Sequence, residues 1–160
     1  ELATVTDALT QAGCAVERWE DSLRLRAEGP LRAIPPIRTA PYPGFPTDAQ
    51  AILMAALLRA RGATVFEENI FENRYRHVDE LARMGADIRT SGRVAVVTGV
   101  EHLHGAPVRC TDLRGGAALC VAALAAEGQT EVREVQHIQR GYEDLPRDLR
   151  ALGAAVYEIE

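Results

Sequence analysis

One carboxylate and three arginines are the side chains whose types and positions in this sequence favour chemistry. Asp48 ends the loop 41–48, in which three prolines restrict the backbone before an apolar segment begins. A carboxylate fixed beside a cleft can accept a proton from a substrate hydroxyl, whereas at a helix start it caps unpaired backbone N–H groups. Both interpretations of Asp48 stay open. Arg74, Arg114 and Arg140 carry fork-shaped donors that suit phosphate or carboxylate groups.

Position, more than residue type, singles out these arginines among the others in the chain. Arg74 and Arg140 are 66 residues apart, and a tyrosine follows each of them closely. Arg114 lies in the first turn of an expected helix, where a positive charge opposes the helix dipole. We interpret this unfavourable placement as evidence for a bound anion, with a structural pair to Asp112 as the alternative. The glycines at 115–116 are expected to let the backbone approach a ligand closely.

Histidine and cysteine residues are weaker candidates for chemistry. His102 and His104 place two imidazoles on one face of an extended segment, but no acidic or cysteine residue has a convincing spacing as a further metal ligand. A surface turn is therefore the favoured interpretation, and no metal is expected. Cys110 and Cys120 lie in apolar surroundings and are predicted to be small core residues. With Cys14 they make an odd number without a CxxC pair, which fits a reducing compartment.

Composition excludes several classes of protein. The 160 residues carry a net charge of −5 with acids and bases interleaved, so no nucleic-acid partner is expected. All 18 basic residues are arginine, which excludes a phosphate-loop lysine or a Schiff-base lysine in this chain. The longest apolar runs, at 51–58 and 117–126, are shorter than the roughly 20 residues that span a bilayer. The start of the chain lacks the features of an export signal, and we expect a cytoplasmic protein without a membrane partner.

A repeat of about 66 residues organises the chain. The pattern Leu-x-x-Φ-Gly, in which Φ is a loosely apolar residue, ends at Gly13, Gly85 and Gly153, where glycine is expected to close a helix. Strands are expected at 23–26 and 94–97, followed by short strands near 37 and at 108–110. A Thr-Asp pair then opens each of two apolar helices, expected at about 48–61 and 112–126.

The two apolar helices predict an unusual arrangement of layers. Both are apolar around most of their circumference, which is typical of helices that are buried on several sides, so we expect helices inside and sheets outside. The chain holds about two and a half units, at about 1–66, 67–132 and an incomplete 133–160. Because it starts and stops within a unit, it is interpreted as a segment of a longer protein.

Five motifs together resemble the UDP-N-acetylglucosamine 1-carboxyvinyltransferases, the enolpyruvyl transferases of peptidoglycan synthesis. They follow in order over nearly the whole chain: PGFPTDAQ at 43–50, IFENRY at 70–75, MGAD at 84–87, TDLR at 111–114 and HIQRGYE at 137–143. The related 5-enolpyruvylshikimate-3-phosphate synthases share the fold but are not expected to show both PGFPTD and FENR. The combination is therefore specific.

The resemblance implies a fold and a reaction. The fold is α/β, an enolpyruvyl-transferase-like inside-out barrel of repeated βαβαββ units, and residues 1–160 match most of the second of two domains. The reaction transfers the enolpyruvyl group of phosphoenolpyruvate to the 3′-hydroxyl of UDP-N-acetylglucosamine and releases phosphate. It takes place in the cytoplasm and needs no metal or organic cofactor.

Five residues receive roles from the resemblance. Asp48 matches the family aspartate that contacts the sugar 3′-hydroxyl and is the proposed general base. Ile70 matches the position whose backbone contacts the acetylglucosamine group. Arg114 and Arg140 match arginines that bind the anionic groups of phosphoenolpyruvate, and Arg74 matches another arginine of the cleft.

The chain also departs from the family pattern. Gln139 stands where the family has an acidic residue, which is expected to loosen the orientation of Arg140, and glycines follow Arg114 where an alanine is common. The family's first domain carries a lysine, further arginines and a loop cysteine that match nothing here, so residues 1–160 alone are expected to be inactive. A non-enzymatic binding or scaffold module of the same fold, and an enolpyruvyl transferase for another hydroxyl, are the alternatives.

Overall fold

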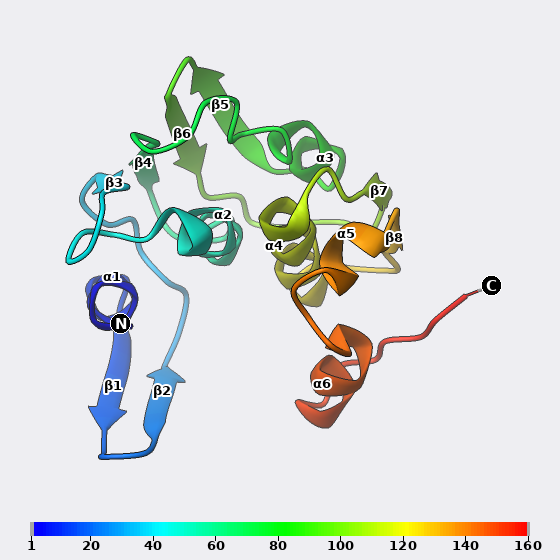
Figure 1. The fold of residues 1–160 in the computed structure, drawn as a ribbon, viewed down its shortest axis with the longest axis horizontal. Helices are drawn as coiled ribbons and strands as arrows, with labels where there is room; N and C mark the ends of the chain where they lie inside the picture. The colour runs from blue at the N-terminus through cyan, green and yellow to red at the C-terminus, as the bar shows by residue number, and fades with distance from the viewer. Residues whose placement is uncertain (1, 160) are drawn as a thin grey trace.

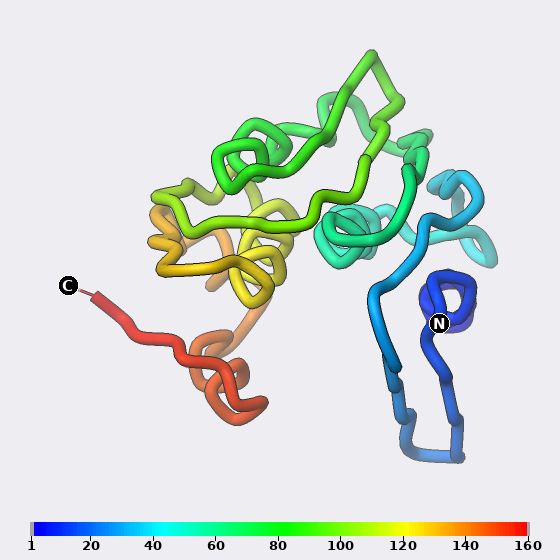
Figure 2. The backbone as a smooth tube through the Cα atoms, turned by 180° about the vertical axis from the view of Figure 1, so that it is seen from behind, coloured from blue at the N-terminus to red at the C-terminus, as the bar shows by residue number. Residues whose placement is uncertain are grey.

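The computed structural model describes residues 2–159, and its elements return in the same order along the chain (Figures 1 and 2). The strands are β1 (Cys14–Arg18), β2 (Leu23–Ala27), β3 (Ile37–Arg38), β4 (Ala63–Glu67), β5 (Asp87–Ser91), β6 (Val94–Thr98), β7 (Pro107–Arg109) and β8 (Glu131–Arg133). The helices are α1 (Ala3–Gln11), α2 (Thr47–Ala56), α3 (Val78–Arg83), α4 (Leu113–Leu124), α5 (Gln136–Gln139) and α6 (Leu145–Ala151). The run β3-α2-β4-α3-β5-β6 is one complete βαβαββ series.

The strands form three small sheets. One has the order β3-β4-β6-β5, in which β3 and β4 are parallel and the other pairs antiparallel. The antiparallel pair β1-β2 and the parallel pair β7-β8 are separate. Figure 1 shows α2 and α4 side by side in the centre with the sheets around them. This is the predicted placement of helices inside and sheets outside.

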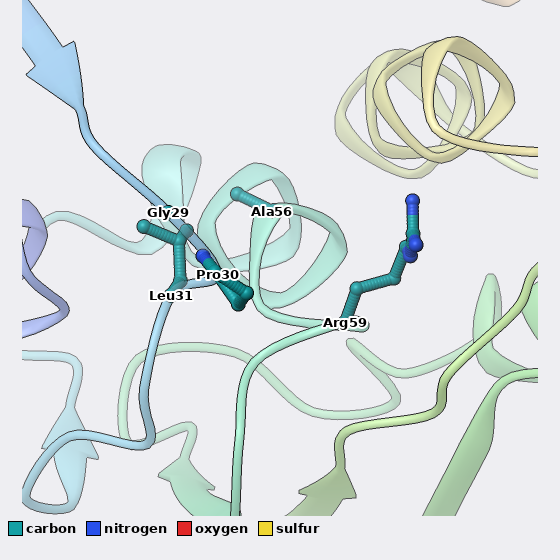
Figure 3. A pocket seen from close by; sticks show the side chains of 5 residues that line it. All are labelled: Gly29, Pro30, Leu31, Ala56 and Arg59. Carbon is teal, nitrogen blue, oxygen red and sulfur yellow. The ribbon is translucent and has the colours of Figure 1, made fainter.

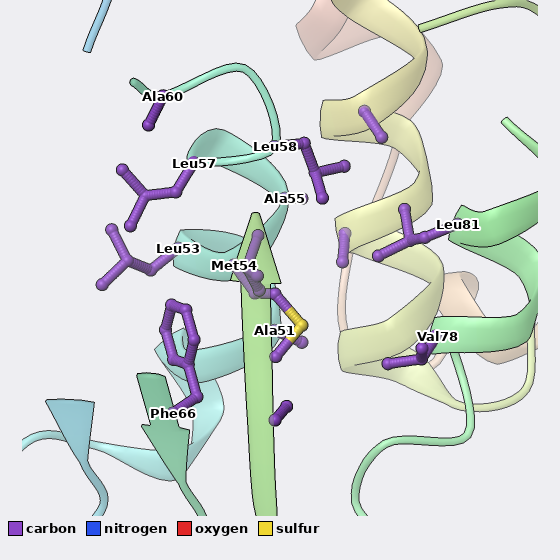
Figure 4. Packing of buried hydrophobic residues seen from close by; sticks show 14 of the residues in the cluster. Ala51, Leu53, Met54, Ala55, Leu57, Leu58, Ala60, Phe66, Val78 and Leu81 are labelled. Atoms are coloured by element: carbon purple, nitrogen blue, oxygen red, sulfur yellow. The ribbon is translucent and has the colours of Figure 1, made fainter. Parts of the chain in front are cut away.

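Apolar residues of α2 build the core in two directions (Figure 4). Met54 faces α4, and in α4 the small buried residues Ala118 and Ala122 allow the two helices to pack closely. On the other side, Leu53 and Leu57 lie near Phe66 of β4. All are buried in one continuous apolar cluster. The helix that begins at the candidate site is thereby fixed on two sides.

Of the two predicted inner helices, one ends earlier than expected and the other has nearly the expected boundaries. We expected a helix at about 48–61, but α2 ends at Ala56. The amide of Leu57 is shared between the carbonyls four and three residues back, and that of Leu58 bonds only to the carbonyl three residues back. The apolar pattern continues because this turn is buried as well. In contrast, α4 agrees with the expected 112–126 to within two residues at each end.

The glycines that end the helices behave as predicted. Gly13, Gly85 and Gly153 have φ values of 108°, 89° and 93°, a region in which a Cβ is unfavourable. The expected strands at 23–26 and 94–97 lie within β2 and β6, although every residue of β2 is exposed. Among residues 2–159, no helix is both long and apolar enough to cross a membrane.

Candidate active site

Asp48 is the second residue of α2, and its side chain does not cap that helix. Pro46 occupies the N-cap position, and no side chain accepts a hydrogen bond from the free amides there. The interpretation of Asp48 as a helix cap is therefore wrong. The carboxylate is instead 62% exposed and turns toward α4.

Two arginines hold this carboxylate from different parts of the chain. Nε of Arg114 donates to Oδ1 of Asp48 at 2.7 Å, and Nη2 of Arg74 lies 3.4 Å from the same oxygen. Hydrogen bonding to Asp48 raises the pKa of Arg114 above its ordinary value, so the guanidinium is charged. The structure thus brings together three of the five predicted site residues around one oxygen.

Asp112 is the residue that caps the next inner helix. Its Oδ1 accepts hydrogen bonds from the backbone amides of Arg114 and Gly115, both at 2.9 Å. Burial raises the pKa of Asp112, but these two hydrogen bonds, together with the interactions with His77 and Arg74, outweigh it and the pKa is lowered. Asp112 therefore fixes the backbone of Arg114, while the guanidinium pairs with Asp48. The predicted side-chain pair between Arg114 and Asp112 is replaced by this arrangement.

Arg74 bridges several groups and is mostly buried. Its side chain is 17% exposed, and its guanidinium lies 5.1 Å from the centre of the Phe71 ring. Its Nε has no hydrogen-bond partner among the described residues. Asn73, with φ of 53°, makes the turn that directs Arg74 inward. Arg74 is therefore placed to orient Asp48 rather than to lie open to a ligand.

Arg140 lies beside an open pocket next to Asp48. The pocket has a volume of about 250 Å³, and its lining consists of Asp48, Leu113, Arg114, Gly141 and Tyr142. Arg140 directly precedes the last two, at the end of α5, and is exposed. Within residues 2–159 it makes no ion pair, so its guanidinium is available to an anion.

The glycines after Arg114 serve packing, and their close approach to a ligand stays a prediction. A Cβ on Gly116 would lie 2.7 Å from Cγ1 of Ile138 and 2.9 Å from Sγ of Cys110. A Cβ on Gly115 would lie 3.0 Å from Cβ of His77. The glycines therefore let α3 and α5 pack against the start of α4.

Ile70 offers its carbonyl, not its amide, to a ligand. Its backbone N–H donates to Oε1 of Glu68 at 2.8 Å, and no described residue donates to its carbonyl oxygen. Sequence reasoning missed Glu68, which is 1% exposed. Thr64 and Phe66 lie on the buried side of β4, and Glu68, one residue past its end, continues this period-two pattern, which was the available signal.

Sequence reasoning also missed His77, a buried histidine beneath the site. Its side chain is 1% exposed, and neither ring nitrogen has a hydrogen-bond partner within the described chain. Burial lowers the pKa of His77 to about 4, with the charge of Arg74 acting in the same direction and that of Asp112 against it. The imidazole is therefore neutral at pH 7.

The remaining candidates lie away from this site. Nδ1 of His102 is 2.7 Å from Glu127, and no cluster of three metal-ligating side chains occurs among residues 2–159. Burial raises the pKa of Cys110 to about 12 and that of Cys120 to about 11, as expected of unreactive core thiols.

A second pocket lies between the segment that follows β2 and the C-terminal end of α2. It has a volume of about 320 Å³, and Figure 3 shows its lining residues: Gly29, Pro30, Leu31, Ala56 and Arg59. Arg59 extends away from the other four, and its Nε donates to the carbonyl of Glu101. No acid, histidine or cysteine lines this pocket, so acid–base chemistry is assigned to the Asp48 pocket.

Comparison with known sequences identifies similar proteins over nearly the whole chain. Residues 1–149 match the family model of EPSP synthase (3-phosphoshikimate 1-carboxyvinyltransferase). A UDP-N-acetylglucosamine 1-carboxyvinyltransferase of Desulfofundulus thermocisternus is 56% identical over 149 residues, which cover 93% of this chain and 61% of that protein. One from Zymomonas mobilis is 51% identical over 159 residues, covering 99% of this chain and 37% of the relative. The chain thus spans between about one third and three fifths of these relatives.

Solved structures show the same fold. The enolpyruvyl transferase NikO from Streptomyces tendae superposes with a TM-score of 0.86 at 34% identity, over 96% of this chain and 35% of NikO. EPSP synthase from Acinetobacter baumannii superposes with a TM-score of 0.72 at 20% identity, over 98% of this chain and 36% of the synthase. The second likeness concerns the fold alone.

Proposed function

We propose, because the chain belongs to the EPSP synthase (3-phosphoshikimate 1-carboxyvinyltransferase) family, that the full-length protein containing it is an enolpyruvyl transferase. Its substrates are phosphoenolpyruvate and UDP-N-acetylglucosamine, the acceptor in the names of relatives at 49–56% identity. One observation carries the proposal: Arg114 and Arg74 hold the carboxylate of Asp48 at the edge of an open pocket.

Asp48 is the group that receives the proton of the acceptor hydroxyl. The 3′-oxygen of the sugar bonds to C2 of phosphoenolpyruvate while its proton passes to the carboxylate, and a proton from solvent or from an acid of the first domain adds at C3 to complete a tetrahedral intermediate. Loss of one proton from C3 to solvent and breakage of the bond from C2 to the phosphate oxygen restore the double bond and release inorganic phosphate. Asp48 returns its proton to solvent, so the net products are the enolpyruvyl ether and inorganic phosphate. A carboxylate in a fixed position suits this role because general-base catalysis depends first on geometry.

Arg114 and Arg140 bind the anionic groups of phosphoenolpyruvate. Arg114 lines the pocket and Arg140 lies beside it without an internal ion pair among residues 2–159. Fixed guanidinium groups stabilise the charge of the intermediate as well as that of the substrate. When the anion binds, Arg114 is shared with it, and Asp48 becomes available to the hydroxyl.

Ile70 contacts the acetamido group of the acceptor through its backbone. Its amide is already bonded to Glu68, so the carbonyl oxygen is the group that can accept a hydrogen bond from the acetamido N–H. This contact distinguishes the acetylated sugar from a plain hydroxyl compound.

Residues 1–160 form part of the second domain of this enzyme, in repeat units at about 1–66, 67–132 and 133–160. The rest of the protein supplies the first domain, against which the cleft closes. The reaction takes place in the cytoplasm without metal or organic cofactor, and the isolated segment is inactive.

The test is a phosphate-release assay on the full-length protein. We expect release only when both substrates are present, and mass spectrometry of the product should show an enolpyruvyl ether of UDP-N-acetylglucosamine. An acceptor analogue without the 3′-hydroxyl should give no release. Turnover with a different hydroxyl acceptor would replace the assignment of UDP-N-acetylglucosamine as the substrate. The likeness to the enolpyruvyl transferase NikO makes such an acceptor the alternative to test. Binding of both substrates without any turnover would favour a non-enzymatic module.

A further inference from the structure

Glu68 is a buried carboxylate that four neutral donors surround. Its Oε1 accepts hydrogen bonds from the Thr39 hydroxyl at 2.9 Å and from the amides of Ile70 and Phe71 at 2.8 and 3.0 Å. Its Oε2 accepts one from the Thr47 hydroxyl at 2.8 Å. The side chain makes no ion pair with any described residue. A buried charge that is satisfied only by hydroxyls and amides acts as a hub for the segments that donate them.

The donors come from three segments that meet at the acceptor side of the site. Thr39 directly follows β3, Thr47 directly precedes Asp48, and Ile70 and Phe71 belong to the loop after β4. Thr39 also accepts a hydrogen bond from the amide next to Glu68, at residue 69, over 2.8 Å. One carboxylate therefore fixes the distance between the start of α2 and the loop 69–71.

We propose that Glu68 is a positioning residue for the acceptor substrate, holding the Asp48 carboxylate and the Ile70 carbonyl at the spacing that the acetylated sugar requires. This inference rests on the proposed function, which assigns these two groups to the acceptor. Glu68 itself touches no substrate. It acts through Thr47 on one side and through the amides of Ile70 and Phe71 on the other.

The arrangement favours an ionised carboxylate. Burial raises the pKa of Glu68, but the hydrogen bonds from Phe71, Thr47, Ile70 and Thr39 outweigh it, so the pKa is lowered. A glutamine at this position keeps one oxygen for three of the donors. Its amide nitrogen then faces the Thr47 hydroxyl, which can turn to accept a hydrogen bond. Glutamine should therefore rescue what alanine loses.

The donor-substrate side of the pocket makes no direct bond to Glu68 and is linked to it only through Asp48. The side chain of Asp112 fixes the backbone of Arg114, and Arg140 directly follows α5. Neither arginine bonds to Glu68. Loss of Glu68 should thus affect the two substrates differently. A general loss of structure would affect both.

The experiment compares Glu68→Ala, Glu68→Gln and Glu67→Gln in the full-length protein. Glu67 is the matched control, because it is the neighbouring glutamate and pairs with exposed Arg38 at 2.8 Å instead of with the loops. For Glu68→Ala we expect the KM for UDP-N-acetylglucosamine to rise ~10- to 100-fold, with the KM for phosphoenolpyruvate within about twofold of wild type. Glu68→Gln should stay within about threefold of wild type for both substrates, and Glu67→Gln should be unchanged.

Hydrogen exchange supplies a readout that does not depend on activity. The amides of Ile70 and Phe71 should exchange faster in Glu68→Ala than in wild type and Glu68→Gln, because their acceptor is lost. If Glu68→Ala does not fold, Thr47→Val serves instead, since it removes one donor and keeps the shape. It should raise the acceptor KM about three- to tenfold and leave the phosphoenolpyruvate KM unchanged.

The outcomes separate the inference from the proposed function. Equal increases in both KM values, or an unchanged acceptor KM in an active variant, would overturn the positioning role. A wild-type protein that does not turn over the two substrates would overturn the proposed function. In that case, unaltered exchange at Ile70 and Phe71 in Glu68→Ala would also refute the role of Glu68 as the hub of these loops.

Discussion

Oδ1 of Asp48 lies 2.7 Å from Nε of Arg114, so an ion pair joins the start of one inner helix to the first turn of the next. The two side chains are 62% and 37% exposed, and exposed ion pairs contribute only about 0–1 kcal/mol to stability. A substrate anion can therefore take over Arg114 at small cost. In the proposed function, this pair occupies Asp48 until the donor substrate binds Arg114.

This pair predicts the effect of replacing Arg114 with lysine. Lysine keeps the charge but loses the fork that reaches Asp48 and the anion together. We expect Arg114→Lys to raise the KM for phosphoenolpyruvate ~10- to 100-fold, corresponding to the loss of charge-assisted hydrogen bonds. Arg147→Lys, in the first turn of α6, is the matched control and should behave as wild type. An unchanged KM in Arg114→Lys would show that the anion binds elsewhere.

His77 predicts a loss of stability in acid. Its pKa is about 4 in the folded protein, below the ordinary 6.5. Between these two pH values the imidazole is protonated in the unfolded chain and neutral in the native state. The full free energy of unfolding is therefore available above pH 6.5, and the part that depends on a neutral His77 is lost as the pH falls toward 4. At pH 5 the loss is about 2 kcal/mol of the free energy of unfolding.

Denaturant unfolding of the full-length protein between pH 7.5 and 5 measures this loss. His77→Gln should have a flatter pH dependence than wild type, whatever its stability at neutral pH. His137→Gln, at a partly exposed position, is the control and should keep the wild-type slope. Parallel slopes for wild type and His77→Gln would contradict the prediction.

Replacing Gly116 with alanine should disturb the packing beside the pocket. In Gly116→Ala the new Cβ meets side-chain atoms of Ile138 and Cys110 at 2.7 and 2.9 Å, so these two residues must shift, and we expect α5 to move with Ile138. We expect the free energy of unfolding to fall by about 1–3 kcal/mol, because overpacking outweighs the gain in helix propensity. Gly29→Ala is the control, since a Cβ there meets nothing within 4 Å. Equal stabilities of the two variants would show that α4 and α5 separate without cost.

The shift should also be visible in substrate binding. Ile138 lies just before Arg140 and the pocket residues Gly141 and Tyr142, so moving α5 displaces one wall of the pocket. The KM for phosphoenolpyruvate should rise in Gly116→Ala and not in Gly29→Ala.

Local rules were sufficient to predict the repeated elements and the exceptional residues. The prolines before Asp48 and the charge of Arg114 at a helix start singled out two residues that the structure brings into contact. Their mutual contact was not predictable, because 66 residues separate them and only the packing of α2 on α4 brings them together. The role of Asp48 as a cap was wrong for a local reason. Pro46 already occupies the cap position, while Asp112 does cap its helix.

Burial was the harder property to predict. The turn at 57–60 was assigned to a helix because its apolar residues continue the helical pattern, although the backbone leaves it. Glu68 and His77 are polar residue types that normally lie at the surface, and tertiary packing encloses them. Alternation along β4 indicated Glu68, whereas no local pattern indicated His77.

The most direct test of Asp48 as the proton acceptor is the turnover number of Asp48→Asn in the full-length protein. Asparagine keeps the size of the side chain but accepts no proton, so we expect kcat for phosphate release to fall ~10²- to 10⁴-fold. The melting temperature should stay near that of wild type, because the side chain is exposed and caps nothing. Asp79→Asn, in the first turn of α3, is the control and should keep the wild-type kcat. A wild-type kcat in Asp48→Asn would contradict the assignment of Asp48 as the proton acceptor.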